Sequence, residues 1–557
     1  MTEYLEPSDA GRADSYASPD PNSNLMEVRR SSSVDPLPDP VHPDIRWREI
    51  LSILALVALA DITIFRGTGY AGGALLLLVA PFLLVIGSPA PKLSIALSAL
   101  GMMAWATAAR LIWQGSAYSG FAGFLVVTAF AMALSGRTPF ILELLGYICK
   151  SWIDAIDDLG LYDKWLRHRF RFFPKVFSLQ WILPLIAVVV FSGLFVAANP
   201  DLARDVGQSI TRFLNDLGHW LETFSSSPME VAFCIAMGWY VVGILRPSDW
   251  SRELDAFSSP PEKIEITEAS AAQNSSMFSA FRNTIIAVSV LFAAYLVFEF
   301  QTLWFRKFPK GFHYSGYAHE GAFWLTVALA LATVVLSVIF RGSTLQDSRL
   351  PTLRRWTWLW SVENFVLALA VYNRILIYVG FNGMTRMRVV AFLGISSVVV
   401  GFLLVLWKIA HNRGFLWLLR RQILTVTLAA YLYVVTPVDW LVYTYNVRRI
   451  LAGDPAPAVQ ITEHEVSPEG LLTLPPLLFA SDPIIRDGIR SMLTDRAQAL
   501  AAQRASYSNA GWTSYQMVHD RLAQRLSYFP EETSPAVPEA KRSANWERFR
   551  QYVYQWY

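Results

Sequence analysis

The stretch ENFVLALAVYNRILIYVGFNGMTRMR, residues 363–388, decides the fold of this chain. It belongs to an apolar run that is long enough to span a bilayer, because a helix needs about 20 apolar residues for that. Arg374 lies inside the run, which breaks at Asn382-Gly383 before two further arginines. A charge at the bilayer centre costs about 2.5–3.5 kcal/mol on insertion scales, so it requires a polar partner or a wet cavity. We therefore expect this hairpin to lie at the centre of the molecule's function or assembly.

The composition of the whole chain indicates a membrane protein. Of its 557 residues, 54% are hydrophobic and 16% are charged, whereas about 25% are charged in a soluble domain. The net charge of +3 gives no reason to expect a nucleic-acid partner. The two cysteines, Cys149 and Cys234, lie beside a loop and inside an apolar run, so we expect no disulfide framework. We also expect no cleavable signal peptide, because the first apolar run begins only near Ile50.

Apolar runs of spanning length predict an all-α, polytopic transmembrane helix bundle of about eleven spans. Six spans are expected in the first half of the chain, at residues 48–66, 70–87, 93–113, 118–136, 178–198 and 229–246. Five more are expected in the second half, at residues 281–303, 320–341, 357–380, 388–408 and 418–442. Between the fifth and sixth, residues 201–224 have the spacing of an amphipathic helix lying flat on the membrane surface.

These spans divide the chain into five parts. A disordered cytoplasmic tail is expected first, because its Ser-, Asp- and Pro-rich sequence cannot bury enough apolar surface to fold. Two membrane halves follow, separated by a polar linker, and the chain ends in a small extramembrane helical domain. The boundaries are 1–46 for the tail, 47–246 for the first half with a basic loop at 137–177, 247–278 for the linker, 279–442 for the second half, and 443–557 for the C-terminal domain.

The distribution of Lys and Arg predicts the orientation. Both are concentrated on the tail and on the even-numbered loops, and cytoplasmic loops carry the excess of positive charge. We expect a multi-pass protein of the cell inner membrane with a cytoplasmic N-terminus. An odd number of spans then predicts an extracytoplasmic C-terminal domain.

The basic loop at 137–177 has two interpretations. Its arginines and lysines alternate with Trp165, Phe170, Phe172 and Phe173, a pattern typical of binding to anionic headgroups or nucleic acid. It is also typical of a cytoplasmic loop that follows the positive-inside rule, and we favour this second interpretation. The expected partners are the lipid bilayer, with anionic headgroups at this loop, and no nucleic acid.

The C-terminal domain has the sequence features of a helical unit. Ser481-Asp482-Pro483 predicts a helix start, with a capping residue before a first-turn proline, and the helix is expected to run to about Arg504. A second helix is expected at 512–527. The last residues present an apolar stripe at helical spacing, which docks either on the membrane or on the domain itself; it comprises Trp546, Phe549, Val553 and Trp556. A further expectation is that this domain binds a protein partner.

Three short segments within residues 280–450 resemble a known family. They contain Tyr314, Tyr317, Ala318 and Gly321 in the first, Arg374, Tyr378, Gly383, Thr385 and Arg388 in the second, and Asp439, Trp440, Tyr445, Asn446 and Arg448 in the third. In these segments the chain resembles the bacterial polytopic membrane proteins catalogued as domain of unknown function 4173, which are related to the 4153 group. The resemblance implies membrane topology and candidate residues, but no activity.

These observations define a candidate polar site, which consists of Arg374, Glu320, Glu363, Tyr378, Arg388 and Tyr317. Glu363 and Arg374 project from nearly the same side of one helix but lie about 16 Å apart along its axis, so they cannot pair. Each needs a partner from another helix, and for Arg374 we expect Glu320 first and Glu299 second. The arginine then serves either a polar substrate or proton path, or a buried ion pair that fixes helix register.

The sequence predicts no metal and no cofactor. His313, His319 and Glu320 are close in the chain, but their spacing matches no zinc pattern. The phosphate-binding, nucleophile-elbow and dinucleotide-binding fingerprints are missing too.

Three classes of function fit these features. The first is a non-enzymatic carrier, lipid-handling or envelope-assembly component built around Arg374 and the outer ends of the spans at 320–341, 357–380 and 388–408. The second is a membrane-embedded transferase for lipid-linked or headgroup substrates at the outer surface, which would use Glu320 or Asp61 with Arg374. The third is a signalling or scaffold protein that binds through its C-terminal domain. Of these three classes we favour a protein without enzymatic activity.

Overall fold

The computed structural model describes residues 45–169, 227–246, 268–301, 314–340, 349–411, 413–509, 511–527 and 538–556. Within these ranges the regular structure is helical, and seven helices are long and apolar enough to cross a membrane. They are α2 (Tyr70–Gly87), α3 (Ile95–Gln114), α4 (Ala117–Leu134), α10 (Glu268–Glu299), α12 (Leu350–Asn382), α13 (Arg386–Ala410) and α14 (Phe415–Val435). Two shorter apolar stretches lie in α8 (Pro228–Leu245) and α11 (Tyr314–Ile339). The predicted all-α polytopic bundle is confirmed in these ranges.

Some predicted elements lie outside the described residues. These are nearly all of the N-terminal tail, the span at 178–198, the surface helix at 201–224, and the loop that contains His313. The predicted count of eleven spans therefore stays a prediction. The first predicted span, 48–66, corresponds to α1 (Trp47–Ala60) and the π-helical turn η2 (Asp61–Phe65).

Three element boundaries differ from the prediction. Residues 137–177, expected as a loop, contain the 29-residue helix α5 (Ile141–Arg169), whose buried Leu144, Tyr147, Ser151 and Ala155 recur at helical spacing. Helix α10 begins inside the expected polar linker, at Glu268. The last expected span ends early, at Val435, because Pro437 lacks an amide hydrogen and disfavours helix in the residue before it.

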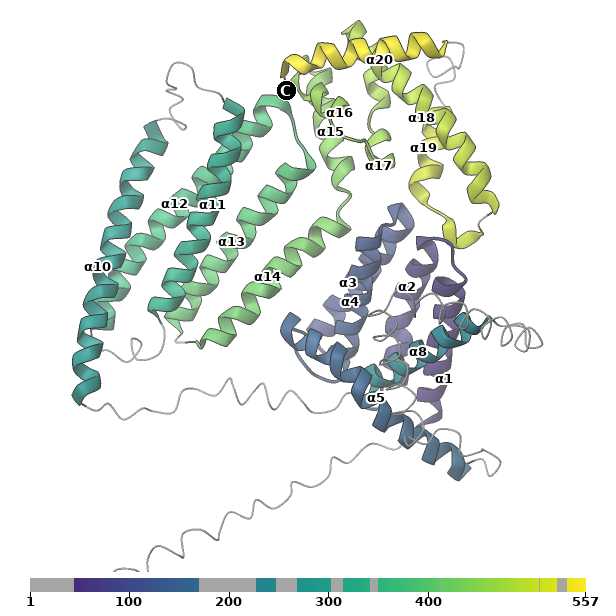
Figure 1. The fold of residues 1–557 in the computed structure, drawn as a ribbon, viewed down its shortest axis with the longest axis horizontal. Helices are drawn as coiled ribbons and strands as arrows, with labels where there is room; N and C mark the ends of the chain where they lie inside the picture. The colour runs from purple at the N-terminus through teal and green to yellow at the C-terminus, as the bar shows by residue number, and fades with distance from the viewer. Residues whose placement is uncertain are drawn as a thin grey trace, which may run out of the picture. The chain divides into compact units, whose positions relative to one another are not determined.

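The helices of the first half pack around one apolar cluster. Its buried members come from α1, α2, α3, α4, α5 and α8, and include Leu84, Phe130, Met132 and Tyr147. At the edge of the cluster, buried Arg246 at the end of α8 pairs with buried Glu49 of α1 at 2.5 Å. The helices are drawn from purple to teal in Figure 1.

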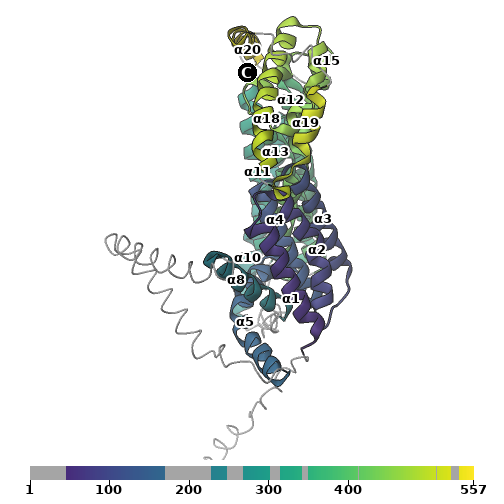
Figure 2. The same ribbon diagram turned by 90° about the vertical axis from the view of Figure 1, so that its right-hand side faces the viewer.

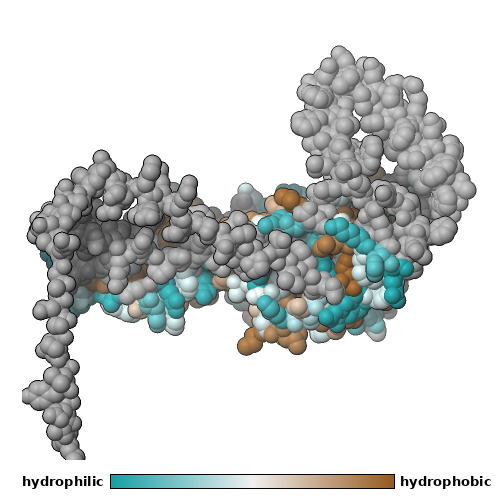
Figure 3. All heavy atoms as spheres, turned by 90° about the horizontal axis from the view of Figure 1, so that it is seen from below, coloured by the Kyte–Doolittle hydropathy of each residue, from teal (hydrophilic) through white to brown (hydrophobic). Residues whose placement is uncertain are grey.

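The second half consists of α10 to α14, which lie side by side in Figure 1. Two buried clusters hold these helices together, one containing Phe340 and Trp360 and the other Leu329, Val371 and Ile395. Large apolar side chains also cover outward-facing positions of these helices, as in Trp324, Leu331 and Leu369. Figure 3, seen from below, shows brown apolar spheres at the surface mainly on the right, on the side of the first membrane half. Apolar side chains at outward positions are what hydrocarbon-facing helices require.

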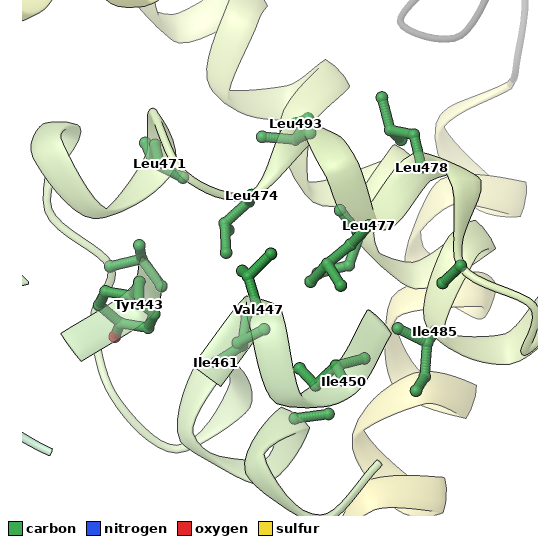
Figure 4. Close-up of a cluster of buried hydrophobic side chains, with 14 of the residues drawn as sticks. Tyr443, Val447, Ile450, Ile461, Leu471, Leu474, Leu477, Leu478, Ile485 and Leu493 are labelled. Atoms are coloured by element: carbon green, nitrogen blue, oxygen red, sulfur yellow. The ribbon is translucent and has the colours of Figure 1, made fainter. Parts of the chain in front are cut away.

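The C-terminal residues form a helical unit with its own core. It is built from α15 (Val438–Leu451), the short α16 (Val459–Thr462) and α17 (Pro468–Leu471), α18 (Pro483–Asn509), α19 (Met517–Ser527) and α20 (Glu539–Val553). Figure 4 shows Val447, Ile450, Leu474 and Leu477 converging in this core, and Figure 2 shows α18 and α19 beside each other. The predicted cap is confirmed, because Asp482 Oδ1 accepts hydrogen bonds from the amides of Ile484 and Ile485.

The apolar stripe near the C-terminus packs inside this unit. Phe549 and Val553 are fully buried, and Trp546 and Trp556 pack against the same core. Of the two predicted roles, packing on the domain itself is the one the structure supports. Phe549 lies directly against Gly488 of α18, where an added Cβ would come within 2.4 Å of the Phe549 Cβ.

A buried ion pair connects this unit to the first membrane half. Arg110 of α3 donates to both carboxylate oxygens of Glu469 in α17, at 2.9 and 2.7 Å. The indole of Trp113 donates to the same carboxylate at 3.1 Å, and Glu469 is 2% exposed. A bidentate arginine–carboxylate contact fixes orientation as well as distance.

We predict that Phe549→Ala destabilises the C-terminal unit by about 3–5 kcal/mol, the usual cost of truncating a buried phenylalanine. Tyr554→Ala, which truncates an aromatic side chain that is 60% exposed, is the matched control and should change stability by only about 0.5 kcal/mol. Thermal unfolding of the full chain, followed by tryptophan fluorescence and limited proteolysis, measures both. Equal effects of the two variants would contradict the packing described for α20.

Candidate functional site

Arg374 lies in α12 with its guanidinium completely enclosed. The residue is 1% exposed, and its partner Glu299, at the end of α10, is 0% exposed. Arg374 Nε donates to Glu299 Oε1 at 2.7 Å, and Nη2 donates to Oε2 at 2.5 Å. Tyr295 closes the cluster, because its hydroxyl accepts from Nη2 and donates to Glu299. The predicted need for an acid from another helix is met by Glu299, the second of the two candidates.

Gly321 of α11 makes room for this cluster. A Cβ at that position would come within 1.7 Å of Arg374 Nη1, so any other residue would displace the guanidinium. Gly321 was singled out in the sequence as part of the Tyr-x-x-Tyr-Ala-x-x-Gly segment. The arginine therefore connects three helices at one point, α10 through its carboxylate, α11 through its glycine and α12 through its own backbone.

The candidate site contains two further acids, Glu363 and Glu320, and only Glu363 has a described side chain. Glu363 lies on α12 in a half-buried position, and its Oε2 has no hydrogen-bond partner among the described residues. Glu320 and Tyr317 belong to the first two turns of α11, and their side chains lie outside the described part of the chain. Asp61 pairs with Arg66 at 3.0 Å, as its closeness in sequence suggested.

Arg388 and Tyr378 form a second polar cluster, at the turn between α12 and α13. The guanidinium of buried Arg388 lies 3.8 Å from the centre of the Tyr378 ring and donates to the Gly383 carbonyl and the Asn382 side chain. Gly383 has φ of 96°, and a Cβ there would lie 2.5 Å from Asn446 Oδ1. A glycine is required at this turn for both reasons.

The C-terminal unit binds the exposed backbone of this turn. Asn446 of α15 accepts from the Met384 amide at 2.7 Å and donates to the Met384 carbonyl at 2.9 Å. Gln460 donates to the Asn382 carbonyl, and Arg449 donates to the carbonyls of Val379 and Gly380. Polar backbone at a helix break is thus paired with protein groups, which makes this half of the candidate site a docking joint.

A polar cavity of about 370 Å³ lies beside this joint. Its walls come from the start of α13 and from the segments around α17, α18 and α19, and its polar lining residues are Arg386, Glu465, Ser467, Arg496 and His519. Arg386 is held in place by Asp439, whose two oxygens accept from Nε and Nη2 at 2.5 Å. Arg388 was predicted as a site residue and Arg386 was not, although both follow the same turn. Only the position of the C-terminal unit distinguishes the two arginines.

An apolar groove of about 580 Å³ runs between α13 and α14, with α11 on its other side. Small residues on two facing helices create the space: Gly394, Ser397 and Gly401 on α13, with Ala429 and Ala430 on α14. The groove begins at Val390, one helical turn after Arg386. Val390 and Val426 line it while remaining exposed, at 43% and 61%, so the groove opens toward the surroundings of the bundle.

Comparison with known proteins identifies one family. A family model described as Domain of unknown function (DUF4153) matches residues 71–474, which is more than half of the chain. This is the 4153 group that the short motifs indicated as a relative, while placement in the 4173 group stays a prediction. No curated protein and no solved structure matches the chain.

We predict that Arg374→Leu strongly destabilises the protein, because it leaves Glu299 buried without its charge partner. Breaking a buried pair from one side costs about 3–5 kcal/mol. The double variant Arg374→Leu with Glu299→Leu should recover much of this loss, since an apolar pair leaves no buried charge. Protein level in membranes and thermal unfolding in detergent measure both variants. A stable Arg374→Leu protein would rule out a structural role for the pair.

A second prediction concerns His519, which lines the polar cavity. Burial lowers the pKa of His519 below its ordinary value of 6.5, against a smaller opposing effect of Asp520. Between the lowered pKa and 6.5, the unfolded chain binds a proton that the folded chain does not, so the C-terminal unit loses stability as the pH falls through that window. His519→Gln should reduce this loss in thermal unfolding measured across a pH series. The same pH dependence in both proteins would refute the assignment.

Proposed function

The chain belongs to the family described as Domain of unknown function (DUF4153). We propose a lipid-handling role without catalysis for this integral membrane protein. The observation that carries the proposal is the apolar groove between α13 and α14. It lies on helices of spanning length and opens beside exposed valines. In a bilayer, the material that meets such a surface is the acyl chain of a lipid.

The dimensions of the groove support an acyl chain as its occupant. From Val390 to Gly401 a helix rises about 16 Å, which is close to the ~15 Å thickness of one hydrocarbon leaflet. The lining is almost entirely apolar, and Gln422 and Tyr433 of α14 are among its few polar side chains. An acyl chain in this groove would make van der Waals contact with helix surface that the protein itself leaves uncovered.

The surroundings of Arg374 argue against the alternative of an enzyme that uses this residue. Its guanidinium is enclosed by Glu299, Tyr295 and Gly321, and none of the described cavities is lined by it. A group that contacts substrate must be reachable by substrate, whereas a buried, fully engaged pair fixes helix register. Of the carrier, lipid-handling and envelope-assembly roles, the groove favours lipid handling.

We propose that the protein lies in the inner membrane of the cell. The excess of Lys and Arg on the tail and on the even-numbered loops supports the inner membrane, with the N-terminus in the cytoplasm and the C-terminal unit outside. In that orientation the groove would run through the outer leaflet, since α13 begins at the C-terminal unit. Lipids of that leaflet would then be its occupants.

We predict that Gly394→Leu removes lipid from the groove. A Cβ at Gly394 meets no other atom within 4 Å, so the larger side chain enters the empty space without displacing the backbone. The variant should lower photo-crosslinking of a lipid with a photoactivatable acyl chain to α13 and α14 on the order of tenfold, since each buried methylene contributes about 0.8 kcal/mol.

The matched control is Gly380→Leu. Gly380 is also a helical glycine whose added Cβ would meet no atom within 4 Å, but it lies on α12 and does not line the groove. Crosslinks should be mapped by mass spectrometry of the purified full chain in lipid nanodiscs. Unchanged crosslinking in Gly394→Leu, or an equal loss in Gly380→Leu, would overturn the assignment of the groove to lipid.

A further inference from the structure

The polar cavity and the apolar groove share one face of α13. Arg386 lines the cavity, and Val390, Gly394, Ser397 and Gly401 line the groove at successive helical turns. Residues three or four apart fall on the same side of a helix, so the two spaces follow one stripe. A molecule that occupies both must be amphiphilic, with a polar end at Arg386 and an apolar end beyond Val390.

We propose that the cavity binds the phosphate of a phospholipid headgroup whose acyl chain lies in the groove. This inference rests on the proposed lipid-handling function and adds the chemical class of the lipid. It commits to a membrane lipid and not to free phosphate, because the groove begins one helical turn after Arg386 on the same face of α13.

The hydrogen-bonding state of Arg386 supports an anionic ligand. Asp439 accepts from Nε and Nη2, and the Glu465 carbonyl accepts from Nη2 at 3.0 Å. Nη1 forms no hydrogen bond within the part of the chain that the structure describes. Two contacts therefore hold the guanidinium plane at the cavity wall, and its remaining nitrogen is available. Arginine fixed in this way suits phosphate oxygens, which accept from planar donor groups.

Arg496 supplies a second donor from α18. It lines the cavity, is exposed, and forms no ion pair or hydrogen bond with any described residue. Ser467 and His519 add a hydroxyl and an imidazole to the same lining. Two guanidinium groups in one lining, Arg386 held by Asp439 and Arg496 without a partner among the described residues, fit a group that carries several acceptor oxygens.

Acidic residues also surround the cavity, so removing an acid and removing an arginine should change lipid binding in opposite directions. Asp439 offsets the charge of Arg386, and Asp520 lies next to His519. Glu465 is an exposed residue of the cavity lining and has no ion-pair partner in the described ranges. A carboxylate at the wall repels a phosphate, so its removal should strengthen binding while removal of Arg496 weakens it. If these exposed side chains had only a structural role, the two substitutions would not change lipid binding in opposite directions.

The experiment measures lipid retained by the full chain in detergent, by native mass spectrometry during titration with phosphatidylglycerol. Arg496→Gln should weaken retention on the order of tenfold, as expected for a lost hydrogen bond to a charged group. Glu465→Gln should strengthen it. Arg548→Gln is the control, because Arg548 is an exposed arginine on α20 that does not line the cavity, and it should leave retention unchanged.

A diacylglycerol with the same acyl chains, but without phosphate, separates this inference from the proposed function. If both lipids crosslink to the groove equally, and Arg496→Gln affects neither, the groove assignment stands and the phosphate assignment is overturned. If neither lipid crosslinks to the groove, the proposed function itself fails. Binding of inorganic phosphate alone, without retention of phosphatidylglycerol, also overturns the inference, because the cavity would then serve a free anion.

Discussion

The contact between Arg374 and Glu299 is the constraint on which the second membrane half depends. Neither side chain is exposed to more than 1%, so each charge has to be satisfied by the protein. The pair fixes α12 against α10, and Gly321 allows α11 to close over the guanidinium. Since the pair has one bidentate geometry, it permits one register between these helices. The apolar clusters around it add stability but would tolerate small shifts that the ion pair does not.

At the turn between α12 and α13, polar backbone groups must likewise be paired by the protein, here through hydrogen bonds from side chains. A break in a membrane helix exposes backbone groups, and here Asn446, Gln460 and Arg449 of the C-terminal unit pair with them. The unit is thereby seated on the hairpin through hydrogen bonds of fixed direction. Arg388 is buried in the joint, where it donates to the Gly383 carbonyl and the Asn382 side chain. Arg386, two positions earlier, lies at the edge of the joint and lines the polar cavity. One structural requirement thus produces both the joint and the candidate ligand site.

Much of this arrangement could be predicted from the sequence, because hydrophobic length and buried charge are local properties. The described spans, the cap at Asp482 and the need of Arg374 for an acid follow from them. Helix α5 was missed because its apolar stripe is interrupted by many charges, which hid the 3.6-residue period. That Glu299 meets Arg374 depends on how α10 rotates against α12, which no local pattern specifies. The roles of Arg386, Arg496 and His519 depend on segments brought together from three distant parts of the chain, and no local pattern reports that.

The bond from Arg110 to Glu469 has a mechanical consequence. Glu469 directly follows Ser467 and Pro468, which line the polar cavity. Its carboxylate accepts hydrogen bonds from Arg110 and Trp113 of α3. The wall of the cavity is therefore tethered to a helix of the opposite membrane half. A tilt of α3 in a bilayer of different thickness would act on that wall through this contact, so we expect the polar cavity to respond to bilayer thickness.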